Sequence, residues 1–151
     1  MGKYLLGLDC GHTVTKAVLF DLTGKQLSVG KGKNLQISQH PGWQERTMHD
    51  AAEAALDAIS EAIKNIDSSE IVAVGVAGHG DGIYLLDKHH QPLRNAIFAT
   101  DNRASAIATE INRVHGDALM KSMGQHLFAA SPMALLSWMK HEEPEKYQNI
   151  G

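Results

Sequence analysis

The 151-residue sequence is poor in cysteine and in long apolar runs. The single cysteine, Cys10, excludes an internal disulfide, and its place in an apolar run favours a reducing compartment. No stretch approaches the roughly 18–20 apolar residues of a membrane span. The apolar run at 4–8 is too short for the apolar part of a signal peptide, and no cleavage site follows it. We therefore expect a cytoplasmic protein with no membrane partner.

The charge pattern excludes further classes of function. The formal net charge is −3 and the lysines and arginines form no cluster, which argues against a nucleic-acid partner. The nine histidines are scattered without metal-ligand spacing, and neither a Walker A loop nor a G-x-G-x-x-G fingerprint occurs. A hydrophobic content of 43% is enough for one ordinary core, so we expect one domain.

The first half of the chain predicts a small sheet followed by a helix. Short β-rich runs joined by tight turns predict an antiparallel meander with strands at 4–8, 15–20 and 26–29. We expect an irregular connection at 30–42. Apolar residues at three- and four-residue steps then predict a helix over 50–65, with a face made of Ala52, Ala55, Leu56, Ile59, Ile63 and Ile66.

The continuous apolar run from Ile71 to Ala77 predicts a buried strand, added in parallel to the meander. Short strands are expected at 83–86 and 97–98, and helices over 102–114 and from Pro132 onward. Three antiparallel strands, a helix and a further strand form the plan of the ribonuclease H-like, actin-like ATPase fold. We therefore predict an α/β fold with a mixed sheet and flanking helices.

One segment at the first turn carries phosphate chemistry. The first strand ends at Asp9, and Gly11 permits a positive φ in a turn whose backbone N–H groups can converge on an anion. Thr13 and Thr15 add hydroxyl donors, and Lys16 adds a positive charge. Phosphoryl transfer needs these groups, since its catalysis is mostly positioning and charge neutralisation. A plain β-hairpin with a turn glycine explains the same residues, and this alternative stays open.

The pattern D-x-G-x-T-x-[TS]-[KR] at 9–16 resembles the first phosphate motif of the FGGY family of sugar kinases. Further segments resemble that family in its own order: P-G-W-x-E at 41–45, I-x-A-I-G-I at 71–76, and the P-A-I-x-W-x-D-x-R region at 95–103. Together they cover nearly the whole chain. Within the family, the sequence is most similar to L-xylulose kinases and related pentulose or polyol kinases, on the segments 7–11, 85–88 and 135–145.

The resemblance implies the N-terminal lobe of a two-lobe kinase that binds ATP and Mg²⁺ in a cleft, with a small polyhydroxylated substrate beneath the γ-phosphate. Asp9 corresponds to the family's metal-associated aspartate, which holds Mg²⁺ directly or through water. Thr13, Thr15 and Lys16 correspond to phosphate-loop positions, and Gly11 belongs to the same turn.

The resemblance also implies a sugar site. The loop after the 71–77 strand grips sugar hydroxyls in the family, and here it holds His79, Gly80 and Asp81. A carboxylate at Asp81 can accept hydrogen bonds from two substrate hydroxyls. Gly80 replaces the arginine of glycerol kinases, which argues against glycerol, and Ala99 replaces a family tryptophan.

Three more residues complete the implied sugar site: Trp43, Asp101 and Arg103. Each has a structural alternative. Asp101 can be a helix N-cap with Arg103 in the first turn, and Trp43 can be a packing residue.

The family's catalytic base and adenine pocket lie in a C-terminal lobe, and no aspartate at 1–151 matches the base motif. The resemblance therefore implies an ATP-dependent kinase acting on a ketopentose or similar polyol, with L-xylulose as first candidate. It also implies a C-terminal lobe as partner, a possible homodimer, and no activity for residues 1–151 alone. Two alternatives remain: a non-catalytic sugar-binding or regulatory module, and a chaperone- or actin-type ATPase, which the P-G-W-x-E and D-x-R segments disfavour.

Overall fold

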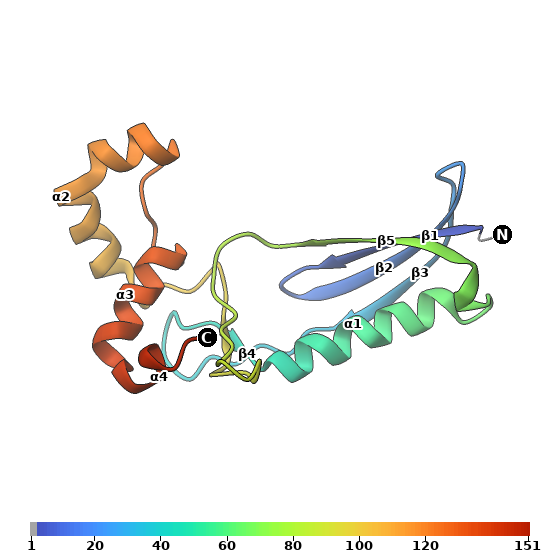
Figure 1. Ribbon diagram of the computed structural model, residues 1–151, viewed down its shortest axis with the longest axis horizontal. Coiled ribbons are helices and arrows are strands. Elements are labelled where there is room, and N and C mark those ends of the chain that lie inside the picture. Colours follow the sequence, from blue (N-terminus) through green and yellow to red (C-terminus); the bar gives the residue numbers. More distant parts are fainter. Residues whose placement is uncertain (1–2) are drawn as a thin grey trace. The chain divides into compact units, whose positions relative to one another are not determined.

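The structure, a computed structural model, describes residues 3–151 and divides into two compact units (Figure 1). Unit 1 comprises the chain up to residue 35 and residues 49–79, and unit 2 comprises 36–48 and 80–151. Each unit has its own apolar cluster of buried residues. Within residues 3–151, no helix combines the length and the apolar character needed to cross a membrane.

Unit 1 is a four-stranded mixed sheet in the order β3-β2-β1-β5. Strand β2 is antiparallel to both β1 and β3, and β5 is parallel to β1, as the sequence predicts. Helix α1 covers one face of the sheet (Figure 1). The elements are β1 (Tyr4–Cys10), β2 (Val14–Asp21), β3 (Gln26–Lys33), α1 (Met48–Ile63), a 3₁₀ turn (Ser68–Glu70) and β5 (Ile71–Gly78).

Helix α1 approaches β3 unusually closely. A Cβ at Gly30 would overlap the carbonyl oxygen of Ala58, and one at Gly32 would overlap that of Ala54. The most buried line of α1 is therefore alanine, and Leu56, which we expected on the buried face, is 62% exposed. The glycines also let β3 continue to Lys33, where the sequence predicted an irregular connection from residue 30.

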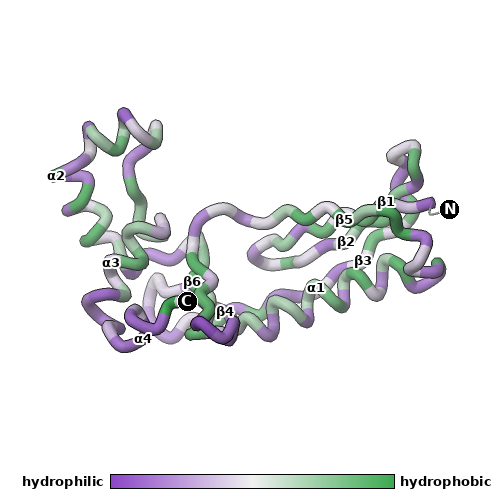
Figure 2. The backbone as a smooth tube through the Cα atoms, viewed as in Figure 1, coloured by the Kyte–Doolittle hydropathy of each residue, from purple (hydrophilic) through white to green (hydrophobic). Residues whose placement is uncertain are grey.

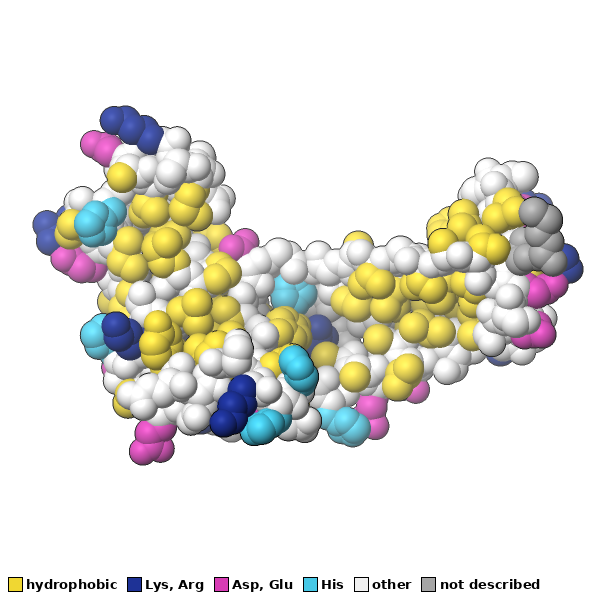
Figure 3. Space-filling view, in the orientation of Figure 1, with side chains coloured by type: hydrophobic (Ala, Val, Ile, Leu, Met, Phe, Trp, Pro, Cys, Tyr) yellow, Lys and Arg dark blue, Asp and Glu magenta, His cyan; other side chains and the backbone are white. Residues whose placement is uncertain are grey.

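Strand β5 lies at the edge of the sheet and is exposed from Val72 to Gly78, so the prediction of a buried strand is wrong. Val72, Val74 and Val76 are 53–70% exposed. Figure 2 shows that β5 is mostly apolar, and Figure 3 shows hydrophobic side chains gathered on the surface of unit 1. The physical reason is that the cluster around α1 takes its buried strand residues from β1 and β2, and β5 lies beyond them.

Unit 2 is mainly helical. Two short antiparallel strands, β4 (Glu45–Arg46) and β6 (Ala96–Ile97), pair beside the helices α2 (Ser105–Met123), α3 (Pro132–Glu142) and α4 (Pro144–Gln148). Helix α3 begins at Pro132, as predicted, and the side chain of the preceding Ser131 makes no capping hydrogen bond. Residues 83–86 make only isolated bridges, Ile83 to Ile97 and Leu86 to Pro92, so the strand expected there is wrong.

Candidate functional site

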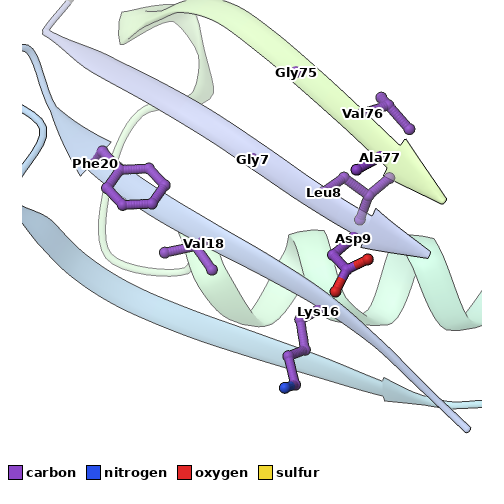
Figure 4. Close-up of a pocket in the computed structure, with 9 residues that line it drawn as sticks. All are labelled: Gly7, Leu8, Asp9, Lys16, Val18, Phe20, Gly75, Val76 and Ala77. Carbon is purple, nitrogen blue, oxygen red and sulfur yellow. The ribbon is translucent and has the colours of Figure 1, made fainter. Parts of the chain in front are cut away.

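The predicted phosphate residues lie on the β1–β2 hairpin of unit 1. Asp9 and Lys16 are partners in the antiparallel register, and both are exposed. They form the polar end of an otherwise apolar groove (Figure 4), lined also by Gly7, Leu8, Val18, Phe20, Gly75, Val76 and Ala77. A carboxylate and an ammonium group are thereby held side by side at the end of a rigid strand pair.

The turn between the strands needs glycine for space. A Cβ at Gly11 would lie 2.8 Å from the carbonyl oxygen of Val14, which is closer than real contacts allow. Gly11 is not among the residues with positive φ, so the turn does not use the left-handed conformation that glycine permits. The close approach of the two strands, and not an unusual dihedral angle, explains this glycine.

Asn34 braces the turn, and the sequence did not point to it. Its Nδ2 donates to the carbonyl oxygen of Gly11 at 2.7 Å, and its backbone N–H donates to that of Thr13 at 3.3 Å. Its Oδ1 accepts a hydrogen bond from the hydroxyl of Thr15 at 3.2 Å. Thr15 is 1% exposed, so in this structure its hydroxyl supports the turn, while Thr13 remains exposed.

Asp9 suits a magnesium ion that is shared with phosphates. Residues 3–151 contain no group of three or more histidine, cysteine, aspartate or glutamate side chains able to hold a metal ion. Mg²⁺ typically uses one or two carboxylates together with substrate phosphates and water. The exposed carboxylate of Asp9, beside the predicted phosphate turn, fits that donor set.

His79 meets the hairpin turn within unit 1. The ring of His12 lies 4.1 Å from that of His79, centre to centre. The β1–β5 register pairs Cys10 with Gly78, which brings the ends of these strands together. The structure thus places the first residue of the predicted sugar loop beside the predicted phosphate turn. His12 lies inside the phosphate motif at 9–16, but its place in the sequence does not predict this contact.

The remainder of the sugar loop belongs to unit 2. Asp81 is exposed and has a φ of 58°, and Gly82 follows with a φ of 73°. The backbone N–H of Gly82 donates to the carbonyl oxygen of Ala130 at 2.9 Å. Non-glycine residues in the left-handed region are uncommon and concentrate at functional sites, and aspartate is among those that tolerate it best. At Gly80 a Cβ would meet no atom within 4 Å. Steric exclusion therefore does not explain why this position holds glycine where glycerol kinases have arginine.

Asp101 is buried, and its carboxylate oxygens are fully hydrogen-bonded to protein groups. Its carboxylate accepts hydrogen bonds from the backbone N–H of Gln44 at 2.7 Å and from that of Arg103 at 2.9 Å. It also accepts from Nε and Nη2 of Arg103, at 2.9 and 2.8 Å. Four hydrogen bonds fill the acceptor capacity of a carboxylate. Asp101 therefore positions two segments in this structure, and direct contact with a sugar would require it to give up a protein partner.

Arg103 completes a buried charge cluster, which we define as Glu45, Arg94, Asp101, Arg103 and Glu143. The side chains of Asp101 and Arg103 have no exposed surface. Nη1 of Arg103 lies 2.7 Å from Oε1 of Glu45, and Arg94 bridges Glu45 to Glu143. The guanidinium carbon of Arg103 lies 4.0 Å from the ring centre of Trp43 and 5.1 Å from that of Trp138.

The structure brings Trp43, Asp101 and Arg103 together within unit 2. The sequence missed Glu45, Arg94 and Glu143 as their partners. Glu45 lies within the P-G-W-x-E segment and was the available signal. No local pattern marks Arg94. Glu143 lies in the segment 135–145, but nothing there indicates its ion pair, because Arg94 is 49 residues away along the chain.

The fold matches the N-terminal lobe of actin-like carbohydrate kinases. Residues 4–151 match the N-terminal domain of the FGGY family of carbohydrate kinases, so the chain belongs to that family. It is 35% identical to the L-xylulose/3-keto-L-gulonate kinase of Escherichia coli K12, over the whole chain and 31% of the relative's length. It is 34% identical to a probable L-xylulose kinase of Pasteurella multocida, over 99% of the chain and 32% of that protein.

Solved structures agree with the sequence match. A ligand-bound xylulose kinase from Lactobacillus acidophilus superposes with a TM-score of 0.91 at 26% identity, over 98% of this chain and 30% of that one. The chain thus spans about a third of the length of the curated relatives it matches.

Proposed function

We propose that this chain is the substrate-gripping part of an ATP-dependent carbohydrate kinase, which transfers the γ-phosphate of ATP to a hydroxyl of a ketopentose or similar polyol. L-xylulose is the first candidate, supported by the identity with the E. coli and P. multocida proteins. The observation that carries the proposal is the exposed Asp9–Lys16 pair on a braced hairpin, within a chain that matches the FGGY N-terminal domain.

The roles of the hairpin residues follow from their exposure. Lys16 and Thr13 would contact phosphate oxygens, with Gly11 allowing the turn and Thr15 holding it through Asn34. Asp9 would hold Mg²⁺, which neutralises phosphate charge when bound. The base that takes the proton of the sugar hydroxyl would be supplied by polypeptide beyond these residues. Residues 1–151 alone should therefore show no sugar-dependent ATP turnover.

The sugar would be held by the exposed loop. His79, the backbone of Gly80 and the carboxylate of Asp81 would accept or donate hydrogen bonds to its hydroxyls. Trp43 would contact the sugar directly, and Asp101 and Arg103 would act from behind it. The free thiol of Cys10 supports a cytoplasmic location. The homodimer implied by the resemblance remains a prediction that light scattering would test.

Turnover by the native gene product that carries residues 1–151 tests the function. ADP release should depend on a pentulose, and Asp81→Asn should raise KM for the sugar about tenfold or more, since a charged hydrogen-bond acceptor is lost. Asparagine also tolerates the left-handed conformation, so the variant removes charge and not the fold. Asp117→Asn, at an exposed aspartate on α2, is the matched control and should leave KM unchanged.

Two outcomes would contradict these assignments. Unchanged kinetics in Asp81→Asn would show that the loop does not bind the sugar. Sugar binding without any ADP release by the native product would favour the alternative, a non-catalytic sugar-binding or regulatory module.

A further inference from the structure

A cation packs against the face of the Trp43 ring. The guanidinium of Arg103 lies 4.0 Å from its ring centre, within the range of a cation–π interaction. Trp138 and His40 contact it at 5.4 and 4.5 Å between ring centres, both in edge-to-face geometry. Trp43 itself is only partly buried. Its orientation is thus fixed on several sides, while part of its surface remains accessible.

One turn of the chain, residues 98–102, separates the segment of Trp43 from the loop of Asp81. On one side, the N–H of Phe98 donates to the carbonyl oxygen of Gln44 at 2.9 Å, and that of Asn102 donates to Gly42 at 3.0 Å. On the other side, a Cβ at Gly82 would lie 3.1 Å from the backbone nitrogen of Ala99. The position of this turn therefore sets the spacing between Trp43 and Asp81.

Arg103 is the side chain that ties this turn to the ring. It binds Asp101 through two nitrogens, and Asp101 in turn accepts the N–H of Gln44. The same guanidinium covers the face of Trp43 and reaches Glu45. A planar, bidentate and stacking group is needed for all three contacts, which an arginine provides and a lysine does not.

We propose that Arg103 is a positioning residue that holds Trp43 at a fixed spacing from Asp81, so that the accessible part of the ring forms an apolar wall for the C–H groups of the sugar. Small-molecule sites combine such an aromatic wall with a few placed polar groups. The inference rests on the proposed function, because it names the sugar as the ligand. It assigns to Arg103 a role that involves no contact with the sugar.

Arg94 provides a matched control. It is also buried, with 6% of its side chain exposed, and it also binds Glu45. Its guanidinium lies over Trp138, 5.9 Å from the ring centre, and not over Trp43. Arg94→Lys therefore disturbs the same charge cluster without removing the group that covers Trp43.

The test uses residues 1–151 with Trp138→Phe, which leaves Trp43 as the single tryptophan. In this background, acrylamide quenching and emission of Trp43 are measured for Arg103→Lys and Arg94→Lys, with and without L-xylulose. Arg103→Lys should raise the quenching constant of Trp43 about twofold or more and weaken L-xylulose binding about tenfold, the scale of one cation–π contact. Arg94→Lys should leave both quantities near the reference.

The outcomes separate the two proposals. If the reference chain binds L-xylulose and the two variants change quenching and affinity equally, the positioning role is wrong while the proposed function stands. If neither L-xylulose nor any other ketopentose or polyol changes the emission of the reference chain, the sugar site fails and the positioning role fails with it.

Discussion

The two units of the chain use their motif residues in opposite ways. In unit 1, Asp9, Thr13 and Lys16 are exposed on a hairpin whose stability comes from strand pairing and from Asn34. In unit 2, Asp101 and Arg103 are buried and engaged by protein groups. The difference teaches that motif residues can have two roles. Some are exposed and available to contact a ligand, whereas others are buried and hold neighbouring segments in place. Burial and hydrogen-bond capacity distinguish the two.

Unit 1 depends on the close approach of α1 to β3, so Gly30 and Gly32 of β3 should be among its most sensitive positions. Gly32→Ala should lower the free energy of unfolding by about 3 kcal/mol, because the new methyl group would force α1 away from β3. Gly75→Ala is the matched control, since a Cβ there meets no atom within 4 Å and its φ is not positive. Urea unfolding followed by circular dichroism measures both. Equal losses for the two variants would contradict the close packing of α1.

The same substitution at two aspartates sharpens the contrast between the units. Asp101→Asn should lower the free energy of unfolding by about 2 kcal/mol, since charge-assisted hydrogen bonds to Arg103 and Gln44 are lost. Asp9→Asn should change it by less than about 0.5 kcal/mol, as is usual for exposed positions. It should instead impair Mg²⁺-dependent turnover by the native gene product.

Thermal and urea unfolding of the two variants, together with Mg²⁺ titration of turnover, give the result. If Asp9→Asn lowered the free energy of unfolding more than Asp101→Asn does, the distinction between exposed ligand-contacting residues and buried structural residues would be wrong.

Not all of this contrast could be predicted from sequence. The meander, α1 and the parallel β5 follow from local periodicity and turn residues, and the Asp9 hairpin follows from its motif. The burial of Asp101 depends on pairing between segments about 57 residues apart, which no local pattern records. The exposure of β5 could not be predicted either. An apolar run indicates that a strand is suited to burial, but it does not indicate which other element, if any, covers that strand.

The smallest expected effects are changes in the pKa of one aspartate in each of two surface turns. The pKa of Asp21 in unit 1 is lowered by the hydroxyl of Thr23 and by the backbone N–H of Lys25. The pKa of Asp87 in unit 2 is lowered by the backbone N–H groups of Gln91 and His89. A lowered pKa in the folded state stabilises the fold above the unfolded value of about 3.9, and this stabilisation is lost as the pH falls through the folded pKa.

Truncation of a neighbouring side chain to alanine should therefore change the aspartate pKa in only one of the two turns. Thr23→Ala should raise the pKa of Asp21 toward its ordinary value, whereas Gln91→Ala keeps the backbone donor and should leave Asp87 lowered. Carboxyl-carbon NMR titration of both variants measures this. A rise for Asp87 in Gln91→Ala would show that the side chain, and not the backbone, lowers its pKa.

The most direct test of the account is to map where ligands bind on residues 1–151 by amide NMR. Mg²⁺·ATP should shift the amides of the β1–β2 turn, residues 9–16, and L-xylulose should shift those of residues 79–82 together with the indole N–H of Trp43. Shifts confined to other surfaces, or no shift with either ligand, would contradict the claim that this chain is the substrate-gripping part of a sugar kinase.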